Sequence, residues 1–159
     1  MNKTTFTLEL DEAGLANAAD FPNLKKYGLY VIRYRGQAIR IGECASGNSR
    51  LKKGFREPLR KVLRGKERKN YIAYHWRSNY ARKKVSIDYY ELEESIFSNA
   101  KFRRALEAEL TFQFRLAVKK WPKEMSEIHF LESLRKKSAV TKAVKEVLGN
   151  YGHEYDEKA

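Results

Sequence analysis

Two short apolar segments around a glycine constrain the fold of this chain more than any other feature. Residues 27–34 are rich in aromatic and β-branched side chains, which suit a pleated, half-buried surface. Residues 38–44 alternate between apolar and polar side chains, so Ile39 and Ile41 are expected on the same face of a strand. Gly36, between the segments, tolerates the positive φ that a tight reversal requires. The stretch predicts a β-hairpin, followed by a polar turn and a basic helix.

The rest of the chain contains both strand and helix patterns. Strands are predicted at residues 4–10, 70–76 and 85–92 from alternation or from aromatic and β-branched composition. Helices are predicted at residues 50–64, with a kink at Pro58, at 100–121 and 139–148, and a short one at 11–23. We therefore expect an α+β fold with a small, mostly antiparallel, three-stranded central sheet. The hairpin supplies two strands and residues 71–76 or 85–92 the third, and the helices that begin near residues 50 and 100 flank the sheet.

The charge of the chain indicates a polyanionic partner. Its 33 Lys and Arg residues against 20 Asp and Glu give a net charge of +13, and the pI is near 9.8. The positive charge concentrates at residues 50–69, 77–84 and 135–145. Nucleic acid is the commonest polyanion, and ten tyrosines beside these cations favour grooves and base stacking over a membrane surface or a basic surface without a fixed partner.

Cysteine usage and the absence of long apolar runs bear on location. Cys44 is the only cysteine, which excludes an internal disulfide and a multi-cysteine zinc site and is compatible with a reducing compartment. The first residues have no apolar stretch of signal-peptide length, and no run is long enough to span a membrane. We therefore expect a soluble, cytoplasmic protein.

The commonest catalytic motifs are absent. Gly47 and Gly54 are isolated, so there is no phosphate-binding glycine loop, and there is no nucleophile elbow. The three histidines have no metal-ligand spacing. His75 is interpreted as structural, and His129 as a loop residue or, alternatively, a neighbour of a site.

What remains is a set of residues at fixed offsets. The tripeptide Gly28-Leu29-Tyr30 lies on the first hairpin strand and Arg40-Ile41-Gly42 on the second; Arg50 follows Gly42 by eight positions, and Leu106-Glu107-Ala108-Glu109-Leu110 lies in the long helix. This pattern, over residues 25–122, resembles the GIY-YIG nuclease superfamily. In that family a Gly-Ile-Tyr and a Tyr-Ile-Gly tripeptide occupy neighbouring strands, an arginine follows on the first helix, and a glutamate on a later helix binds one divalent metal. The resemblance implies a catalytic domain at 25–122, an N-terminal extension at 1–24 and a C-terminal helical extension at 123–159.

The resemblance implies four catalytic residues. Tyr30 would activate or position the attacking water, and Arg50 would contact the scissile phosphate. Glu107 would bind Mg²⁺ or Mn²⁺, with Glu109 as the alternative if the register differs by two. Arg40 stands where the family has a tyrosine, so either it serves as a phosphate clamp or activity is reduced.

The expected function is a metal-dependent endonuclease that hydrolyses phosphodiester bonds in double-stranded DNA. Basic side chains would grip the backbone, largely without reading sequence: Lys52, Lys53, Arg56, Arg60, Arg77, Arg82, Lys83 and Lys84. One alternative is a non-catalytic nucleic-acid-binding protein that keeps the nuclease fold. Another is a small basic interaction protein of a ribonucleoprotein or a toxin–antitoxin pair. The terminal extensions could clamp DNA or form a homodimer.

Overall fold

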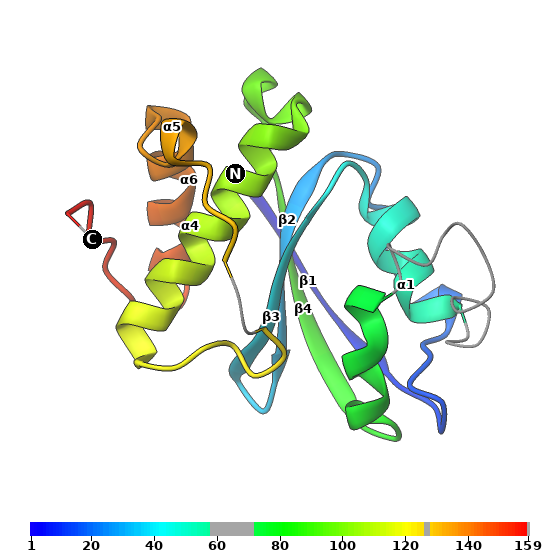
Figure 1. Cartoon of the computed structure of the whole chain (residues 1–159). Helices are drawn as coiled ribbons and strands as arrows, with labels where there is room; N and C mark the ends of the chain where they lie inside the picture. The colour runs from blue at the N-terminus through cyan, green and yellow to red at the C-terminus, as the bar shows by residue number, and fades with distance from the viewer. Residues whose placement is uncertain (58–71, 126–127, 159) are drawn as a thin grey trace.

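The computed structural model describes residues 1–57, 72–125 and 128–158. Its centre is a four-stranded sheet in the order β1-β4-β2-β3, in which every neighbouring pair is antiparallel (Figure 1). The strands are β1 (Asn2–Glu9), β2 (Gly28–Tyr34), β3 (Gln37–Cys44) and β4 (Lys84–Glu91). The predicted α+β class is confirmed. The sheet has four strands instead of three, because the predicted strand near the N-terminus pairs along its length with β4 as an edge strand.

The predicted hairpin forms between β2 and β3, with Tyr30 opposite Gly42. Its turn has positive φ at both Arg35 and Gly36, the geometry that matches the twist of the flanking strands. A register shift after Ile32 adds one residue to β3. This bulge turns Ile39 toward the face that carries Tyr30, whereas Ile41 packs on the opposite face. The expectation that these two isoleucines share a face was therefore wrong.

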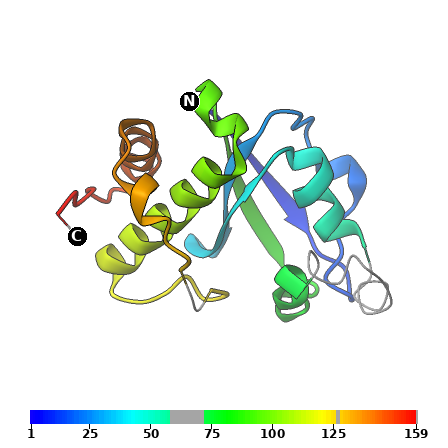
Figure 2. The same cartoon turned by 45° about the horizontal axis from the view of Figure 1, so that its top comes forward.

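Helices cover both faces of the sheet (Figures 1 and 2). One face packs against α1 (Lys52–Arg56) and the 3₁₀ segment η3 (Ile72–Tyr80), and the other against α4 (Ala100–Val118) and α6 (Ser138–Gly149). The shorter elements are the 3₁₀ turns η1 (Ala18–Asp20) and η4 (Ser95–Ser98), the π turn η2 (Gly47–Leu51) and α5 (Glu132–Arg135). Two apolar cores result, one on each side of the sheet.

The predicted strand at residues 70–76 was wrong within the described part of the chain, where η3 begins at Ile72. Its buried side chains are Tyr74, Trp76, Arg77 and Tyr80, and three of them, Tyr74, Arg77 and Tyr80, are spaced by three residues, the period of a 3₁₀ helix. The aromatic composition of this segment therefore reflects burial and not strand pairing. The strand predicted at 85–92 is confirmed as β4 and provides the third strand beside the hairpin.

The short helix predicted at residues 11–23 is also wrong, because only the 3₁₀ turn η1 forms there. The Asp11 carboxylate accepts the main-chain N–H groups of Ala13 and Leu15, and Gly14 has a positive φ. Such local hydrogen bonds compete with a helix. The helix predicted from residue 50 is α1, which ends at Arg56, and residues 58–64 with the kink at Pro58 lie outside the described residues.

The two predicted helices beyond residue 99 are confirmed as α4 and α6. The Asn99 side chain accepts the Lys101 N–H and caps α4, which ends where Lys119 takes a left-handed conformation before Pro122. The apolar face of α6 packs in the same core as Leu29 on β2. Strand β1 and helix α6, which belong to the expected terminal extensions, are thus part of the packed fold.

A buried carboxylate joins the C-terminal tail to the sheet. Asp88, on β4, accepts hydrogen bonds from Thr5 Oγ1 at 2.7 Å and from Tyr151 Oη at 2.5 Å, and it pairs with Arg33 Nε at 2.9 Å. Asp88 is fully buried. Within the described ranges, no helix is both long and apolar enough to cross a membrane.

Candidate active site

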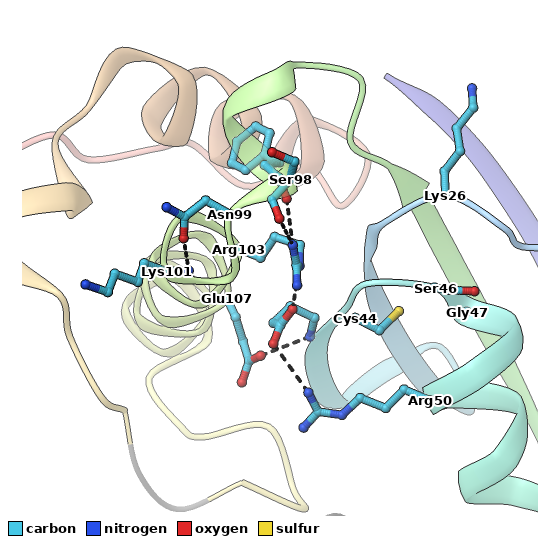
Figure 3. A network of polar contacts seen from close by, with 12 residues as sticks. Lys26, Cys44, Ser46, Gly47, Arg50, Ser98, Asn99, Lys101, Arg103 and Glu107 are labelled. Carbon is cyan, nitrogen blue, oxygen red and sulfur yellow. Dashed lines mark hydrogen bonds and ion pairs between the residues drawn. The ribbon is translucent and has the colours of Figure 1, made fainter.

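Two of the predicted site residues, Arg50 and Glu107, meet at the outer edge of β3 (Figure 3), where both contact Glu43. Its main-chain N–H donates to Glu107 Oε2 at 2.9 Å. Its carboxylate pairs with Arg50 Nη1 at 3.3 Å through Oε1 and with Arg103 Nε at 2.8 Å through Oε2. Glu43 thus holds a residue of α4 and a residue of the η2 turn at the same end of the sheet.

The two arginines that pair with Glu43 differ in exposure and in the number of groups that they contact. Arg103 is buried, and its Nη1 also donates to the carbonyl groups of Phe97 and Ser98 at 2.8 and 2.9 Å, so it is fixed on all sides. The Arg50 side chain is 45% exposed, and among the described residues its side chain pairs with Glu43. Arg50 therefore has donors left for a ligand, whereas Arg103 positions Glu43.

Glu107 is half-buried on α4. Burial raises the pKa of its carboxyl group to about 7, and the negative charge of Glu43 adds to this effect. The Glu43 N–H and the charges of Arg40 and Arg50 act in the opposite direction. Glu107 is therefore close to half protonated at neutral pH in the absence of a cation, which is unusual for a glutamate.

Tyr30 lies beneath Gly42, where any Cβ would overlap its phenol ring. Only a glycine at this position of β3 leaves room for that ring. Burial raises the pKa of Tyr30 above its usual value, although the positive charges of Arg40 and Arg50 lower it. The phenol is also influenced by the charge of Glu107. Tyr30 packs in the core on the α1 side of the sheet and does not line the pocket of Glu107, so it is linked to the other predicted residues through their charges.

Arg40 is held by the segment that follows α4. Its Nη1 donates to the carbonyl of Glu124 at 3.1 Å, and its buried Nε has no hydrogen-bond partner among the described residues. The same segment lies along β3, because the Glu124 N–H donates to the carbonyl of Ile39 at 2.9 Å. Arg40 thus supplies positive charge behind Tyr30 in place of the phenol that the family has at this position.

A pocket of about 420 Å³ opens beside these residues, and Glu43, Arg50 and Glu107 all line it. Its wall also contains Lys101, Arg104 and His129, so cations predominate. His129 is therefore a neighbour of the site, which was the alternative interpretation of this residue. His75 is exposed on η3 and does not line this pocket.

The residues present fit a cation held by one carboxylate. No group of three or more histidine, cysteine or acidic side chains with the geometry of a metal site occurs in the described part of the chain. Both Glu43 oxygens already pair with arginines, and Glu107 has one oxygen engaged by an N–H group. Mg²⁺ usually keeps several waters and binds one or two carboxylates, so the single carboxylate of Glu107 is within the number that this ion uses.

Glu109, the alternative metal ligand, points elsewhere. It is buried, pairs with Arg135 Nε at 2.9 Å and accepts a hydrogen bond from Gln113 at 3.1 Å. Those contacts lie on the side of α5, and Glu109 does not line the pocket of Glu107. The geometry favours Glu107 for the predicted role.

The predicted nucleic-acid-binding residues fall into three groups. Lys52, Lys53 and Arg56 line a separate pocket of about 930 Å³ at the outer side of α1. Arg82, Lys83 and Lys84 are exposed at the start of β4, with Arg82 paired to Glu12 and Lys84 to Glu9. Arg60 lies outside the described residues.

Arg77 requires a correction, because its side chain is only 1% exposed. Its guanidinium donates to the main-chain carbonyls of Gly54 and Glu57 at the end of α1. Cationic side chains near a helix C-terminus satisfy carbonyl groups that lack partners within the helix. Arg77 therefore holds α1 in place and is not available to a phosphate.

Sequence reasoning did not identify Glu43 and Arg103 as site residues. The available signal was a glutamate inside the otherwise apolar end of a strand and an arginine one turn before Leu106 in a helix. A charged residue at such positions is almost never buried without a partner. Comparisons with protein-family models, curated proteins and solved structures give no match for this chain, so membership of the GIY-YIG superfamily stays a prediction.

Proposed function

We propose that this protein is a metal-dependent endonuclease that hydrolyses phosphodiester bonds in DNA, as its resemblance to the GIY-YIG nucleases implies. The observation that carries the proposal is the connection through Glu43. It ties Arg50 and Glu107, which belong to different elements, to one strand end beside Tyr30. A structural ion pair alone would not require a half-exposed arginine and a carboxylate of raised pKa to open into the same pocket.

Arg50 supplies the phosphate contact in this proposal. Its planar guanidinium presents several donors in a fixed arrangement that matches phosphate oxygens. One of them is used by Glu43, which orients the side chain, and Arg50 lines the pocket. Charge that builds on the phosphate in the transition state is stabilised best by such a preorganised donor.

Glu107 would hold the metal ion. When bound, Mg²⁺ or Mn²⁺ supplies Lewis-acid stabilisation of the phosphate and leaving-group oxygens. The Glu43 N–H fixes one carboxylate oxygen of Glu107 and so sets the direction of the other. The surrounding cations, Arg40 and Arg50, keep the carboxylate from becoming fully protonated at neutral pH.

Tyr30 would position the attacking water, which is the role that the resemblance implies for it, although its side chain is buried and does not line the pocket. Burial raises its pKa, so at neutral pH the phenol is protonated and is a poor base. Arg40 lowers that pKa without reversing the shift. We therefore assign Tyr30 a hydrogen-bonding role and expect Tyr30→Phe to reduce activity less than loss of Glu107.

The grip on DNA comes from neighbouring cations. Lys52, Lys53 and Arg56 follow Arg50 directly and line the pocket at α1, so a strand that reaches Arg50 also passes these residues. Contacts of this kind bind the phosphate backbone regardless of sequence and weaken as salt increases. The net charge of +13 supports the same partner.

Nicking of supercoiled plasmid in Mg²⁺ or Mn²⁺ tests the proposal. The wild-type protein should nick, whereas Glu107→Gln and Arg50→Ala should not, although Glu107→Gln should still bind the plasmid. Glu9→Gln, which removes an exposed carboxylate from β1, is the matched control and should nick like the wild type. If the wild type and Glu107→Gln bind equally and neither cuts, the enzyme assignment is refuted.

One observation favours the non-catalytic alternative. Arg40 replaces the second family tyrosine and is anchored by the Glu124 carbonyl, so the site has one phenol fewer than the family pattern. A protein that only binds DNA would need Arg50 and the α1 cations but not Glu107. Metal-independent binding without cleavage in the plasmid assay would identify this case.

A further inference from the structure

A second pocket lies at the far end of α4, away from the proposed catalytic site. Its volume is about 600 Å³, which is within the range of small-ligand sites. Three segments form its wall: the end of α4 with the loop beyond it, the β2–β3 turn, and the C-terminal tail at Tyr151 and His153. Figure 1 shows the end of α4 and the following loop, in yellow, beside that hairpin turn.

The wall combines flat rings with cations. Trp121 is half-buried, and the Arg115 guanidinium lies 4.4 Å from the centre of its ring. Phe114 contacts the ring of His153 edge-on at 5.5 Å between centroids. Lys120 and Lys123 also line the pocket and are exposed, and none of the described aspartates and glutamates lines it.

The combination of aromatic rings and cations in the wall of this pocket favours some classes of ligand over others. An apolar peptide would bury the two lysines at a cost, and an acidic peptide would not use the aromatic wall. A nucleobase stacks on aromatic rings and arginine planes, while its phosphate pairs with lysine. Base stacking on side chains is tolerant of sequence because every base has a π face.

The pocket lies on the same edge of the sheet as the proposed catalytic site. Ala38 lines this pocket and Glu43 lines the other, and they are five positions apart on β3 (43 − 38 = 5). At about 3.4 Å per residue this is roughly 17 Å. A single strand that spans this distance has a few nucleotides between the two pockets. The loop after α4 contributes Lys123 to this pocket and Met125 to the other, and so connects the two.

We propose that this second pocket binds an unpaired base of the nucleic-acid strand, a few nucleotides from the phosphate at Arg50. The distance to the scissile phosphate rests on the proposed function, whereas the binding of an unpaired base does not. Bases within a duplex are stacked on each other and cannot enter. The protein therefore prefers DNA with a single-stranded segment, such as a flap or a gap, over blunt duplex.

Tryptophan fluorescence provides the first test, in EDTA so that cleavage plays no part. The only other tryptophan, Trp76, is buried, so a change on binding is assigned to Trp121 by its loss in Trp121→Phe. A single-stranded oligonucleotide should quench this fluorescence. An abasic oligonucleotide of the same length, which has the same charge and no bases, should not. Equal quenching by both would overturn the proposal.

A matched pair of variants provides the second test. Val118 lines the pocket and is 41% exposed, whereas Leu116 on the same helix is 42% exposed and does not line it. Val118→Glu places a carboxylate at the bound base and phosphate, and should weaken binding of the oligonucleotide about tenfold or more, given the strength of base stacking. Leu116→Glu makes the same change of charge and exposure and should weaken it little.

The outcomes separate the pocket from the nuclease. If Val118→Glu and Leu116→Glu weaken binding equally, the pocket assignment is wrong even if the protein cuts plasmid. If only Val118→Glu weakens binding and Trp121 is quenched, the pocket assignment holds even if no cleavage is seen. Because both side chains are exposed, both variants should fold, and their thermal unfolding confirms this independently of binding.

Discussion

Replacing Glu107 with glutamine should change how stability depends on pH, and the structure sets the size of the effect. The pKa of Glu107 is about 7 in the folded protein and 4.5 in the ordinary case, a difference of about 2.5. At roughly 1.36 kcal/mol for each pKa unit, the charge costs about 3 kcal/mol of stability when fully ionised. Glutamine cannot ionise, and its amide oxygen can still accept the Glu43 N–H.

The direction of this pH dependence follows from whether the folded or the unfolded chain holds the Glu107 proton. Between pH 4.5 and 7 the unfolded chain loses the Glu107 proton while the folded protein retains it. The contribution of Glu107 to the stability of the wild type therefore falls as pH rises through this window, and it becomes constant above pH 7. The variant lacks this fall. The advantage of Glu107→Gln over the wild type should grow from near zero at pH 4 to about 2 kcal/mol at pH 6 and about 3 kcal/mol at pH 8.

Urea unfolding in EDTA at these three pH values measures the effect, with the free energy of unfolding extrapolated to water. Glu9→Gln reports the effect of removing an exposed carboxylate at each pH. A difference between Glu107→Gln and the wild type that is the same at pH 4 and pH 8 would refute the assignment of a buried, desolvated carboxyl. A difference that shrinks as pH rises would mean that Arg40 and Arg50 outweigh burial.

A divalent cation should reverse this advantage if Glu107 binds it. A ligand that binds only the folded state stabilises that state by mass action. Addition of Mg²⁺ or Mn²⁺ at pH 8 should therefore raise the unfolding free energy of the wild type and leave Glu107→Gln unchanged. Equal stabilisation of both proteins would place the cation elsewhere.

Three further predictions concern the scaffold around the site. Gly42→Ala places a methyl group against the Tyr30 phenol and should lower the unfolding free energy by about 1–3 kcal/mol in urea; an unchanged midpoint would mean that the ring moves aside freely. Asp88→Asn leaves Arg33 without its charge partner and should cost about 3 kcal/mol, seen as a lower Tm; a Tm equal to that of the wild type contradicts a net stabilising pair. Arg77→Met keeps the length of the side chain but leaves two carbonyls at the end of α1 unsatisfied, so it should lower stability by about 2 kcal/mol while binding of DNA keeps its salt dependence; a shallower salt dependence would instead indicate a phosphate contact.

Local patterns predicted the parts of the fold that depend on local interactions. The hairpin follows from β-forming segments around Gly36, and α4 from a long amphipathic stretch between Asn99 and Pro122. The position of β1 could not be predicted in the same way, because its place beside β4 depends on pairing between distant residues. Aromatic content misled at η3, since burial favours the same side chains in a strand and in a 3₁₀ helix.

The residues of the candidate site also differ in whether local sequence or distant contacts reveal them. Tyr30, Arg50 and Glu107 were recognisable because their types and offsets resemble a family pattern. Glu43 was not, because its contribution comes from a main-chain N–H and from two arginines distant in sequence. Arg77 was misjudged because a surface role is the common outcome for a cation, and only the fold reveals the carbonyls that it meets.

The outer edge of β3 limits how this protein can associate with itself. Edge strands present free main-chain groups that can pair with another chain. On β3 three of these groups are occupied, since Ile41 N–H donates to Met125 Sδ, Glu43 N–H to Glu107, and the Ile39 carbonyl accepts Glu124 N–H. A second molecule cannot add a strand there without displacing the proposed metal ligand. Among the described strands, β1 is the edge left for sheet extension, so self-association by that route would leave the pocket of Arg50 and Glu107 open.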